Sequence, residues 1–224
     1  LCPEILTHHA AYDLKTKRFL HIYEDVWMNQ ASSDEITDYI SLALKILKNV
    51  GLTANGVTSP WSAGIKNEKA YVEGIGRAHW RVHRRKLVWY FLHCFTPQNA
   101  RWPWVARSDK ETGQKVISIP ANTGDPFTRV IRKAARKVMK ANAEAGVNRM
   151  LSKDGRHGQI RELVDTGKPI TILTHWQCLY SCGHATGLHG LETLVKRMNS
   201  NFGDAIQWMR CSELAKLTTS NSPE

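Results

Sequence analysis

The sequence predicts an α/β fold in which helices flank a mainly parallel sheet. Strand-like and helix-like segments alternate along the chain, which is the pattern of successive βαβ units. The segment 169–174, Pro-Ile-Thr-Ile-Leu-Thr, is almost continuously apolar or β-branched, as expected of a strand that is buried on both faces. No internal repeat or low-complexity linker divides the 224 residues. We therefore expect one domain over residues 1–224, with an irregular insertion at about 94–125.

Further segments have strand character. The clearest is 86–93, Lys-Leu-Val-Trp-Tyr-Phe-Leu-His, because aromatic and β-branched residues dominate it. The shorter ones are 4–8, the run after Ala54 that breaks at Pro60, 116–119 and 206–209. Their separation by helical segments is typical of a parallel sheet.

Helices are predicted between these strands. The first opens at Ser32, because a Ser-x-x-Glu capping pattern precedes apolar residues at helical spacing, and Gly51 ends it. Asp125 and Pro126 begin another that runs to about Ala145, with the proline in its first turn. The other predicted helices are 67–81, 160–164 and 187–201.

Composition narrows the class of protein. A hydrophobic content of 42% is enough for a packed core. The sequence contains no run of ~18 consecutive apolar residues, so it predicts no membrane-spanning helix. The five cysteines are scattered and odd in number, which favours a reducing compartment such as the cytoplasm over a disulfide framework. Cys178 and Cys182 are followed by His184 and His189, but the spacing is not that of a zinc finger, so we expect a loop there.

Polar and aromatic side chains follow three of the predicted strands. They are His8, His9, Trp61, His175 and Trp176. The carboxyl ends of parallel strands collect at one edge of a sheet, and ligands bind at that edge. We therefore expect His8, Trp61 and His175 to face one cleft.

The same segments resemble, in order and character, the motifs of metal-dependent polysaccharide deacetylases. Residues 4–8, Glu-Ile-Leu-Thr-His, are similar to the family's metal-binding motif, with Tyr12 where its second histidine would stand. Residues 56–61, Gly-Val-Thr-Ser-Pro-Trp, resemble its Gly-Phe-Arg-x-Pro-Tyr/Trp-Gly motif. Residues 173–175, Leu-Thr-His, resemble the strand that ends in Leu-x-His, and the close of the chain from 206 to 214 is similar as well.

The resemblance implies a fold and a reaction. The fold is an incomplete (β/α) barrel with mainly parallel strands and outer helices, and a first β-α unit with an Asp-Asp motif is expected before Leu1. The activity is metal-dependent removal of acyl groups from an N-acetylated sugar or glycan. Zinc is the expected divalent metal: the ion polarises the amide carbonyl and activates water, and a separate histidine protonates the departing amine.

The resemblance also assigns roles to residues. His8 is implied as a metal ligand, with His9 or Asp13 in place of the missing second histidine. His175 is implied as the catalytic acid. The residues expected to contact the carbohydrate are Thr58, Ser59, Pro60, Trp61 and Trp176. Tryptophan suits this role because a flat ring packs on the apolar face of a sugar.

Departures from the family keep a second function open. Thr58 stands in place of the motif's arginine, and Tyr12 in place of a metal-binding histidine. A glycan-binding module of the same fold that has lost its metal site would show such changes. Glu24 and Asp25 could supply carboxylates to the site, but we interpret them as solvated loop charges.

The net charge of +11 suggests a third function. Basic side chains recur at helical spacing in one predicted helix: Arg129, Arg132, Lys133, Arg136, Lys137 and Lys140. Such a stripe attracts anionic polymers or nucleic acid. No nucleic-acid motif accompanies it, so we interpret it as a solvated helix face, and nucleic acid is the least favoured partner. A membrane is not an expected partner.

Overall fold

The computed structural model describes residues 2–130 and 136–220. The chain folds into two compact units. Unit 1 contains the residues up to His93, Pro103–Ile119 and the segment from Met209 onward, and unit 2 contains Cys94–Trp102 and Pro120–Trp208. Each unit has a hydrophobic cluster of its own. No helix among the described residues is long and apolar enough to cross a membrane.

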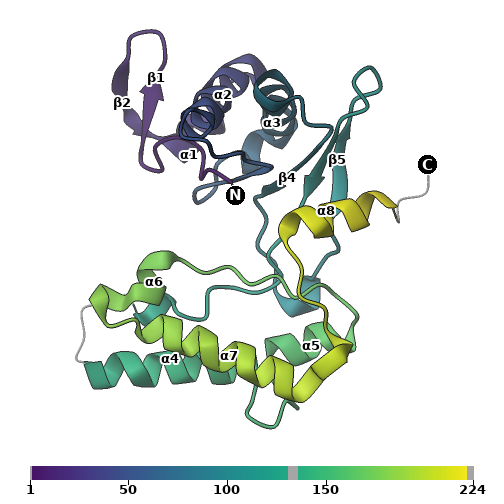
Figure 1. Cartoon of the computed structure of the whole chain (residues 1–224). Coiled ribbons are helices and arrows are strands. Elements are labelled where there is room, and N and C mark those ends of the chain that lie inside the picture. Colours follow the sequence, from purple (N-terminus) through teal and green to yellow (C-terminus); the bar gives the residue numbers. More distant parts are fainter. Residues whose placement is uncertain (1, 131–135, 221–224) are drawn as a thin grey trace. The chain divides into compact units, whose positions relative to one another are not determined.

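Unit 1 consists of a sheet with helices on both faces and a separate β-hairpin (Figure 1). Its helices are α1 (Glu24–Met28), α2 (Ser33–Asn49), α3 (Glu68–His83), which follows the 3₁₀ turn η1 (Ile65–Asn67), and α8 (Cys211–Ser220). Its strands are β1 (Ala10–Asp13), β2 (Arg18–Tyr23), β3 (Gly56–Thr58), β4 (Leu87–Phe91), β5 (Trp104–Ser108) and β6 (Lys115–Ser118). The hairpin is formed by β1 and β2, which pair antiparallel beside α1.

The main sheet has the strand order β3-β4-β6-β5. β3, β4 and β6 are parallel, and β5 is antiparallel to β6. Successive side chains of β4 point to opposite faces: Val88 and Tyr90 join the core with α2 and α3, whereas Trp89 packs with Leu214 of α8. This confirms the mixed α/β class with a mostly parallel sheet. The described strands do not close into a barrel.

The predicted helices of unit 1 are confirmed as α2 and α3. The Ser32 hydroxyl accepts a hydrogen bond from Glu35 N (3.3 Å), and the Glu35 carboxylate accepts one from Ser32 N (2.9 Å), which is the expected capping box. α2 packs against α3, and a Cβ atom at Gly74 would lie 2.4 Å from Ile36 Cγ2. The glycine that weakens the helical pattern of α3 is therefore what allows the two helices to approach.

Unit 2 is mainly helical. Its elements are η2 (Pro97–Asn99), η3 (Thr128–Val130), α4 (Arg136–Met150), α5 (Gln159–Asp165), α6 (Trp176–Tyr180), η4 (Ser181–Gly183), α7 (Thr186–Phe202) and η5 (Gly203–Ala205). α4 and α7 lie side by side (Figure 1). Phe127, Met150 and Leu194 are fully buried between these elements. The predicted helices 160–164 and 187–201 are confirmed as α5 and α7.

The long helix predicted from Asp125 to about Ala145 begins differently. The residues after Asp125 form the 3₁₀ turn η3, and α4 extends to Met150. Residues 131–135 lie outside the described part of the chain. The Asp125 carboxylate accepts a hydrogen bond from Phe127 N (2.7 Å), so it caps a turn, as a short polar side chain at such a position often does.

Three predicted strands are wrong. The first, 4–8, forms only one parallel bridge within the part of the chain that the structure describes, between Glu4 and Thr58. The segment 169–174 forms only one parallel bridge, between Ile172 and Thr123, and its residues are half-buried. Among the described residues it pairs on one side only, so it lacks the second neighbour and the two covered faces that its composition predicts. Residues 206–209 form no strand, because no backbone in the described part of the chain pairs with them, and Trp208 is exposed. In contrast, 94–125 contains the unpredicted strand β5 beside the predicted β6.

Candidate functional site

A parallel bridge between Thr123 and Ile172 in unit 2 positions the first candidate site. Asn122 N donates to Thr171 O (3.1 Å), and Thr171 Oγ1 donates to Pro120 O (2.6 Å), which fixes the two extended segments side by side. Asp125 lies two residues beyond Thr123, and His175 lies three residues beyond the paired Ile172. The register therefore brings an aspartate and a histidine together at the same ends of the two segments, at the start of α6.

Asp125 and His175 form a close pair. One carboxylate oxygen, Oδ2, lies 2.7 Å from His175 Nδ1 and accepts a further hydrogen bond from His175 N (3.1 Å). The side chain of Asp125 is only 4% exposed, whereas that of His175 is 52% exposed. A carboxylate accepts hydrogen bonds, so it favours the imidazole form with the proton on Nδ1. The second ring nitrogen, Nε2, is then the one available for proton transfer.

Cys178 completes a group of three side chains that could hold a metal ion. One ligand atom from each of Asp125, His175 and Cys178 lies within 4.8 Å of the others, and this is the only such group in the described chain. Oxygen, nitrogen and sulfur ligands suit zinc. Burial raises the pKa of the Cys178 thiol to about 11, and the neighbouring Asp125 carboxylate adds to this rise. The thiol therefore carries its proton at neutral pH, and a metal ion would have to displace it.

Only part of this group was visible in the sequence. His175 was a predicted site residue, whereas Cys178 was expected in a loop. The structure instead forms α6 there, so that a spacing of three residues places the two side chains on one face. Asp125 was expected only to cap a helix, and its approach to His175 depends on the tertiary fold. Cys182, His184 and His189 are exposed and form no group of three ligands in the described residues.

The second candidate site is an aromatic cluster in unit 1, formed by His8, His9, Tyr23 and Trp61. The Trp61 ring centroid lies 5.3 Å from that of His8, 6.4 Å from His9 and 5.8 Å from Tyr23. Trp61 is 57% exposed. The cluster therefore presents a half-exposed indole, supported by neighbouring rings, that a flat apolar surface can contact.

Buried Glu24 fixes the backbone beneath this cluster. Its carboxylate accepts hydrogen bonds from Thr7 N (2.8 Å), His8 N (2.8 Å) and Tyr39 Oη (2.8 Å), and it is fully buried. Interpreting Glu24 as a solvated loop charge is therefore wrong, because a cage of donors replaces the water around the carboxylate. Asp25 accepts a hydrogen bond from Ser62 Oγ (2.9 Å), next to Trp61.

The implied metal ligands of unit 1 do not gather into one site. His8 Nδ1 lies 3.4 Å from a Glu4 carboxylate oxygen. Asp13 lies at the far end of β1, where its carboxylate accepts hydrogen bonds from Lys15 N (2.8 Å) and Thr16 Oγ1 (2.6 Å). At a strand rise of ~3.3 Å per residue, Asp13 is roughly 10 Å from the start of β1, next to His9. His8, His9 and Asp13 therefore do not fit a shared metal ion, and a role for each alone stays a prediction.

The residues expected to contact carbohydrate fall in both units. Thr58 is tied to Pro3 through its backbone N (2.9 Å), and the Ser59 hydroxyl lies 2.7 Å from that of Tyr71 in the interior. Both residues thus have structural partners, and Trp61, after Pro60, is the exposed member of that segment. In unit 2, Trp176 adjoins His175 at the start of α6 and is 67% exposed. Since His8 and His175 belong to different units, their shared cleft stays a prediction.

The predicted basic stripe is described only in part. Arg136, Lys137 and Lys140 are exposed on α4, whereas Arg132 and Lys133 lie outside the described residues. In the same segment Val130 and Met139 are buried, whereas Val138 beside Met139 is 48% exposed. The stripe therefore adjoins a packed face, as expected of an amphipathic surface helix.

Comparison with known proteins adds no relative. No family model matches the chain, no curated protein is similar to it at a significant level, and no solved structure matches it. The resemblance to polysaccharide deacetylases thus depends on the quoted motifs alone. Function has to be argued from the Asp125–His175 pair, the metal-capable group and the aromatic cluster.

Proposed function

We propose that the chain is a hydrolase that removes acyl groups from an N-acetylated sugar or glycan, with an incomplete (β/α) barrel of the polysaccharide deacetylase type. The observation that carries the proposal is the buried Asp125 carboxylate, 2.7 Å from Nδ1 of a half-exposed His175. An imidazole held at one nitrogen by a buried acid can transfer protons at the other, as in hydrolases of unrelated folds. His175 also ends the segment that resembles the family's Leu-x-His motif.

In this proposal His175 protonates the departing amine. When water attacks the amide carbonyl, the C–N bond breaks and the nitrogen must gain a proton to leave as an amine. Nε2 of the imidazolium supplies that proton. Asp125 is the positioning residue, because it fixes the orientation of the ring and stabilises the imidazolium form that donates.

The aromatic cluster supports a carbohydrate as the substrate class. Trp61 is exposed beside three other rings, and a pyranose packs its apolar C–H face on such a surface. In unit 2, Trp176 follows His175 directly and gives a second exposed indole next to the proton-transferring residue. We propose both as contacts for the glycan.

Zinc is the metal that we propose for this hydrolase, with His8 as the ligand that the motif resemblance implies. When bound, it would polarise the carbonyl and activate water. Three ligand atoms are also offered by Asp125, His175 and Cys178. In the state that transfers a proton, however, His175 Nδ1 and the Cys178 thiol carry protons. This state and the metal-bound state therefore exclude one another. We propose the proton-transfer role for His175, because the Asp125 carboxylate lies 2.7 Å from Nδ1 and leaves Nε2 to face the substrate.

Metal content and deacetylase activity of three variants test these roles. Acetate release from an N-acetylated chitooligosaccharide is measured with added zinc. His175→Ala should lower the rate about 10²–10⁴-fold and keep the metal content of the wild type. Cys178→Ser should keep both, because a serine hydroxyl can still donate to Asp125. If His175→Ala and Cys178→Ser both lose zinc while His8→Ala keeps it, the three residues of unit 2 are the metal ligands and His175 is not the acid.

A glycan-binding module without activity is the second candidate function. It is favoured by the separation of Asp13 from His8 and His9, which leaves no shared metal site among these three. For such a module, the chitooligosaccharide binds to the wild type, Trp61→Ala abolishes binding, and no acetate appears at any zinc concentration. Acetate release that depends on His175 excludes this alternative.

A further inference from the structure

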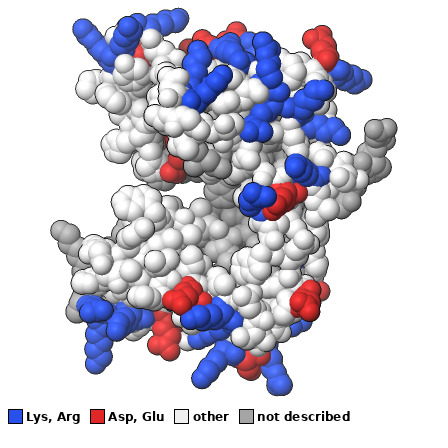
Figure 2. Space-filling model, in the orientation of Figure 1, with Lys and Arg blue, Asp and Glu red and all other residues white. Residues whose placement is uncertain are grey.

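Four of the eight residues that line a pocket at the C-terminal end of α3 are arginines. The pocket has a volume of about 260 Å³. Its lining residues are Arg77, Trp80, Arg81, Arg84, Arg107, Asp109, Thr112 and Gln114. Figure 2 shows that Lys and Arg side chains gather on the face of unit 1 that carries α2, α3 and the β5–β6 hairpin. None of the lining residues belongs to the aromatic cluster or to the group around His175.

The pocket has two walls of different charge. One wall, here called the hairpin wall, is formed by β5 and the turn that leads to β6. On it, Arg107 forms ion pairs with two carboxylates, Glu73 (2.6 Å) and Asp109 (2.7 Å). Backbone donation by Thr112 and the Arg107 guanidinium lower the pKa of Asp109 to about 2, so this carboxylate stays ionised. The hairpin wall therefore has no surplus positive charge, and its charges are fixed by their partners.

The arginines of the α3 wall have only weak partners and can bind an added anion. Arg77 and Arg81 form ion pairs of 2.5 Å with Asp34 and Asp38 of α2, and all four side chains are at least 40% exposed. Exposed pairs of this kind stabilise the protein by only ~0–1 kcal/mol, so an anion that binds arginine more tightly can replace the carboxylates. Arg84 forms no ion pair with a carboxylate in the residues that the structure describes.

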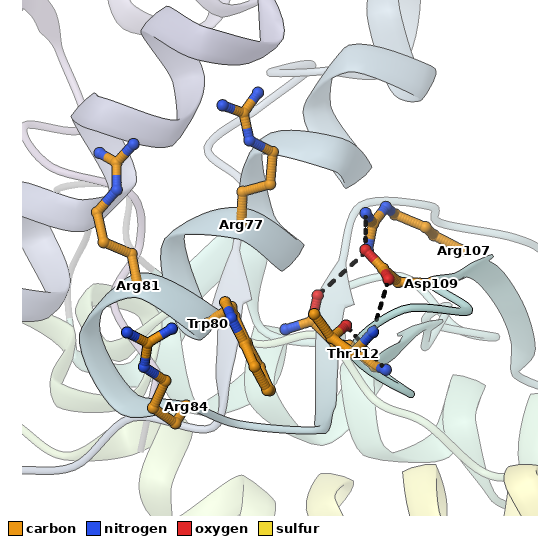
Figure 3. Close-up of a pocket in the computed structure, with 8 residues that line it drawn as sticks. Arg77, Trp80, Arg81, Arg84, Arg107, Asp109 and Thr112 are labelled. Atoms are coloured by element: carbon orange, nitrogen blue, oxygen red, sulfur yellow. Dashed lines mark hydrogen bonds and ion pairs between the residues drawn. The ribbon is translucent and has the colours of Figure 1, made fainter.

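A tryptophan stands between the two walls. The guanidinium carbon of Arg84 lies 5.5 Å from the centre of the Trp80 ring. Figure 3 shows the indole between Arg84 and Thr112, with Arg77 and Arg81 on the same helix above it. An aromatic ligand can stack on an indole and a guanidinium whatever its own hydrogen-bonding groups are. The N–H groups of the guanidiniums, in contrast, bind anions.

We propose that this pocket binds a nucleotide, with its phosphates on Arg81 and Arg84 and its base against Trp80. Phosphate suits the arginines because a guanidinium donates two parallel hydrogen bonds to its oxygens. A free nucleotide and one residue of a single strand present the same groups, and the experiment separates these sources.

Calorimetric titration of the full chain is the first test. ADP should bind with a Kd below about 1 mM, and adenosine and pyrophosphate should each bind at least about tenfold more weakly, because each offers half of the ligand. Oligodeoxyadenylate that binds more tightly than ADP assigns the pocket to single strands, and the reverse assigns it to free nucleotides. Absence of ADP and oligonucleotide binding at millimolar concentration overturns the proposal, and pyrophosphate that binds as tightly as ADP overturns the role of Trp80.

A charge-matched pair of variants is the second test. Arg81→Gln with Arg84→Gly removes two positive charges from the pocket, and should weaken ADP binding about tenfold or more. Glycine at position 84 suits its left-handed backbone (φ 52°), so folding is preserved. Lys66→Gln with Lys69→Gln removes the same charge near the opposite end of α3 and should leave affinity unchanged. Equal losses from both pairs show a nonspecific charge effect and overturn the proposed site.

The base contact has its own pair of variants. Trp80→Phe keeps an aromatic ring and should retain most of the affinity for ADP. Trp80→Leu keeps an apolar side chain without a π-face, and should lower affinity for ADP towards that for pyrophosphate. Thermal melting of each variant confirms that it is folded before titration. Equal affinities of the two variants for ADP contradict a stacked base.

Discussion

The rings of His8 and Trp61 lie 5.3 Å apart, and both residues have left-handed backbone conformations, with φ of 64° and 45°. Such a conformation costs a non-glycine residue ~1–2 kcal/mol. Two neighbouring residues thus hold strained conformations that place their rings together at the surface. Strain of this kind is often retained at functional sites, which agrees with a glycan contact at the aromatic cluster.

Trp61→Gly should therefore separate stability from binding. Glycine adopts positive φ without strain, and the indole that it replaces is largely solvent-exposed, so the free energy of unfolding should change by less than about 1 kcal/mol. Chitooligosaccharide binding should be lost, as measured by calorimetry beside urea unfolding. Trp102→Ala, which removes a similarly exposed indole from unit 2, is the control that should keep the affinity.

Glu24→Gln should destabilise unit 1. The carboxylate accepts hydrogen bonds from backbone donors of 6–8 and from Tyr39. An amide presents N–H groups to some of these donors and leaves them unsatisfied, at a cost of about 3 kcal/mol. Urea unfolding measures this loss, and Glu4→Gln, an exposed change, is the control. A Glu24→Gln variant as stable as the wild type contradicts the role of Glu24 as the anchor of the aromatic cluster.

His79 makes the stability of unit 1 sensitive to acid. Burial lowers the pKa of this histidine to about 3, and the neighbouring charges of His83 and Arg85 add to the effect. Neither ring nitrogen of His79 has a hydrogen-bond partner in the described residues. The unfolded chain binds the proton near pH 6.5 and the folded chain only near pH 3, so stability is complete above pH 6.5 and falls below it by about 1.4 kcal/mol per unit.

His79→Leu should remove this part of the pH dependence. Urea unfolding of the wild type and the variant is compared between about pH 7.5 and about pH 4.5. The free energy of unfolding of the wild type should fall more steeply below about pH 6.5. The difference between the slopes of the two curves should approach that expected for the uptake of one proton on unfolding. Parallel curves show that His79 is protonated in the folded state.

Asp125→Asn should test the positioning of His175 without removing its ring. The asparagine oxygen can still accept from Phe127 N, but the amide N–H₂ then faces Nδ1 and cannot accept its proton. The imidazolium form that donates from Nε2 therefore loses its stabilising partner. We expect a loss of acetate release of about 10²–10⁴-fold with little change in KM. Asp154→Asn, a surface change in the same unit, should have the activity of the wild type. Equal activities of the two variants exclude Asp125 as a positioning residue.

Local patterns determined most of the helices and the fold class. The capping box at Ser32, the helical spacing through α2 and the aromatic run of β4 are properties of short segments, so the sequence contains all of the information that they need. His175 was found because it follows an apolar segment, although α6 after it lies where a loop was expected. Propensity and spacing act over a few residues, and that is the range over which sequence reasoning succeeds.

The tertiary structure decided which segments find partners. The segment 169–174 has the composition of a buried strand, but only one neighbour, at Thr123, pairs with it. Glu24 has the sequence context of a surface charge, yet the backbone of 6–8 folds its donors around it. Asp125 and Cys178 meet His175 although Asp125 is 50 residues away in sequence. Pairing and burial depend on contacts between distant segments, and no local pattern in the sequence encodes which segments those are.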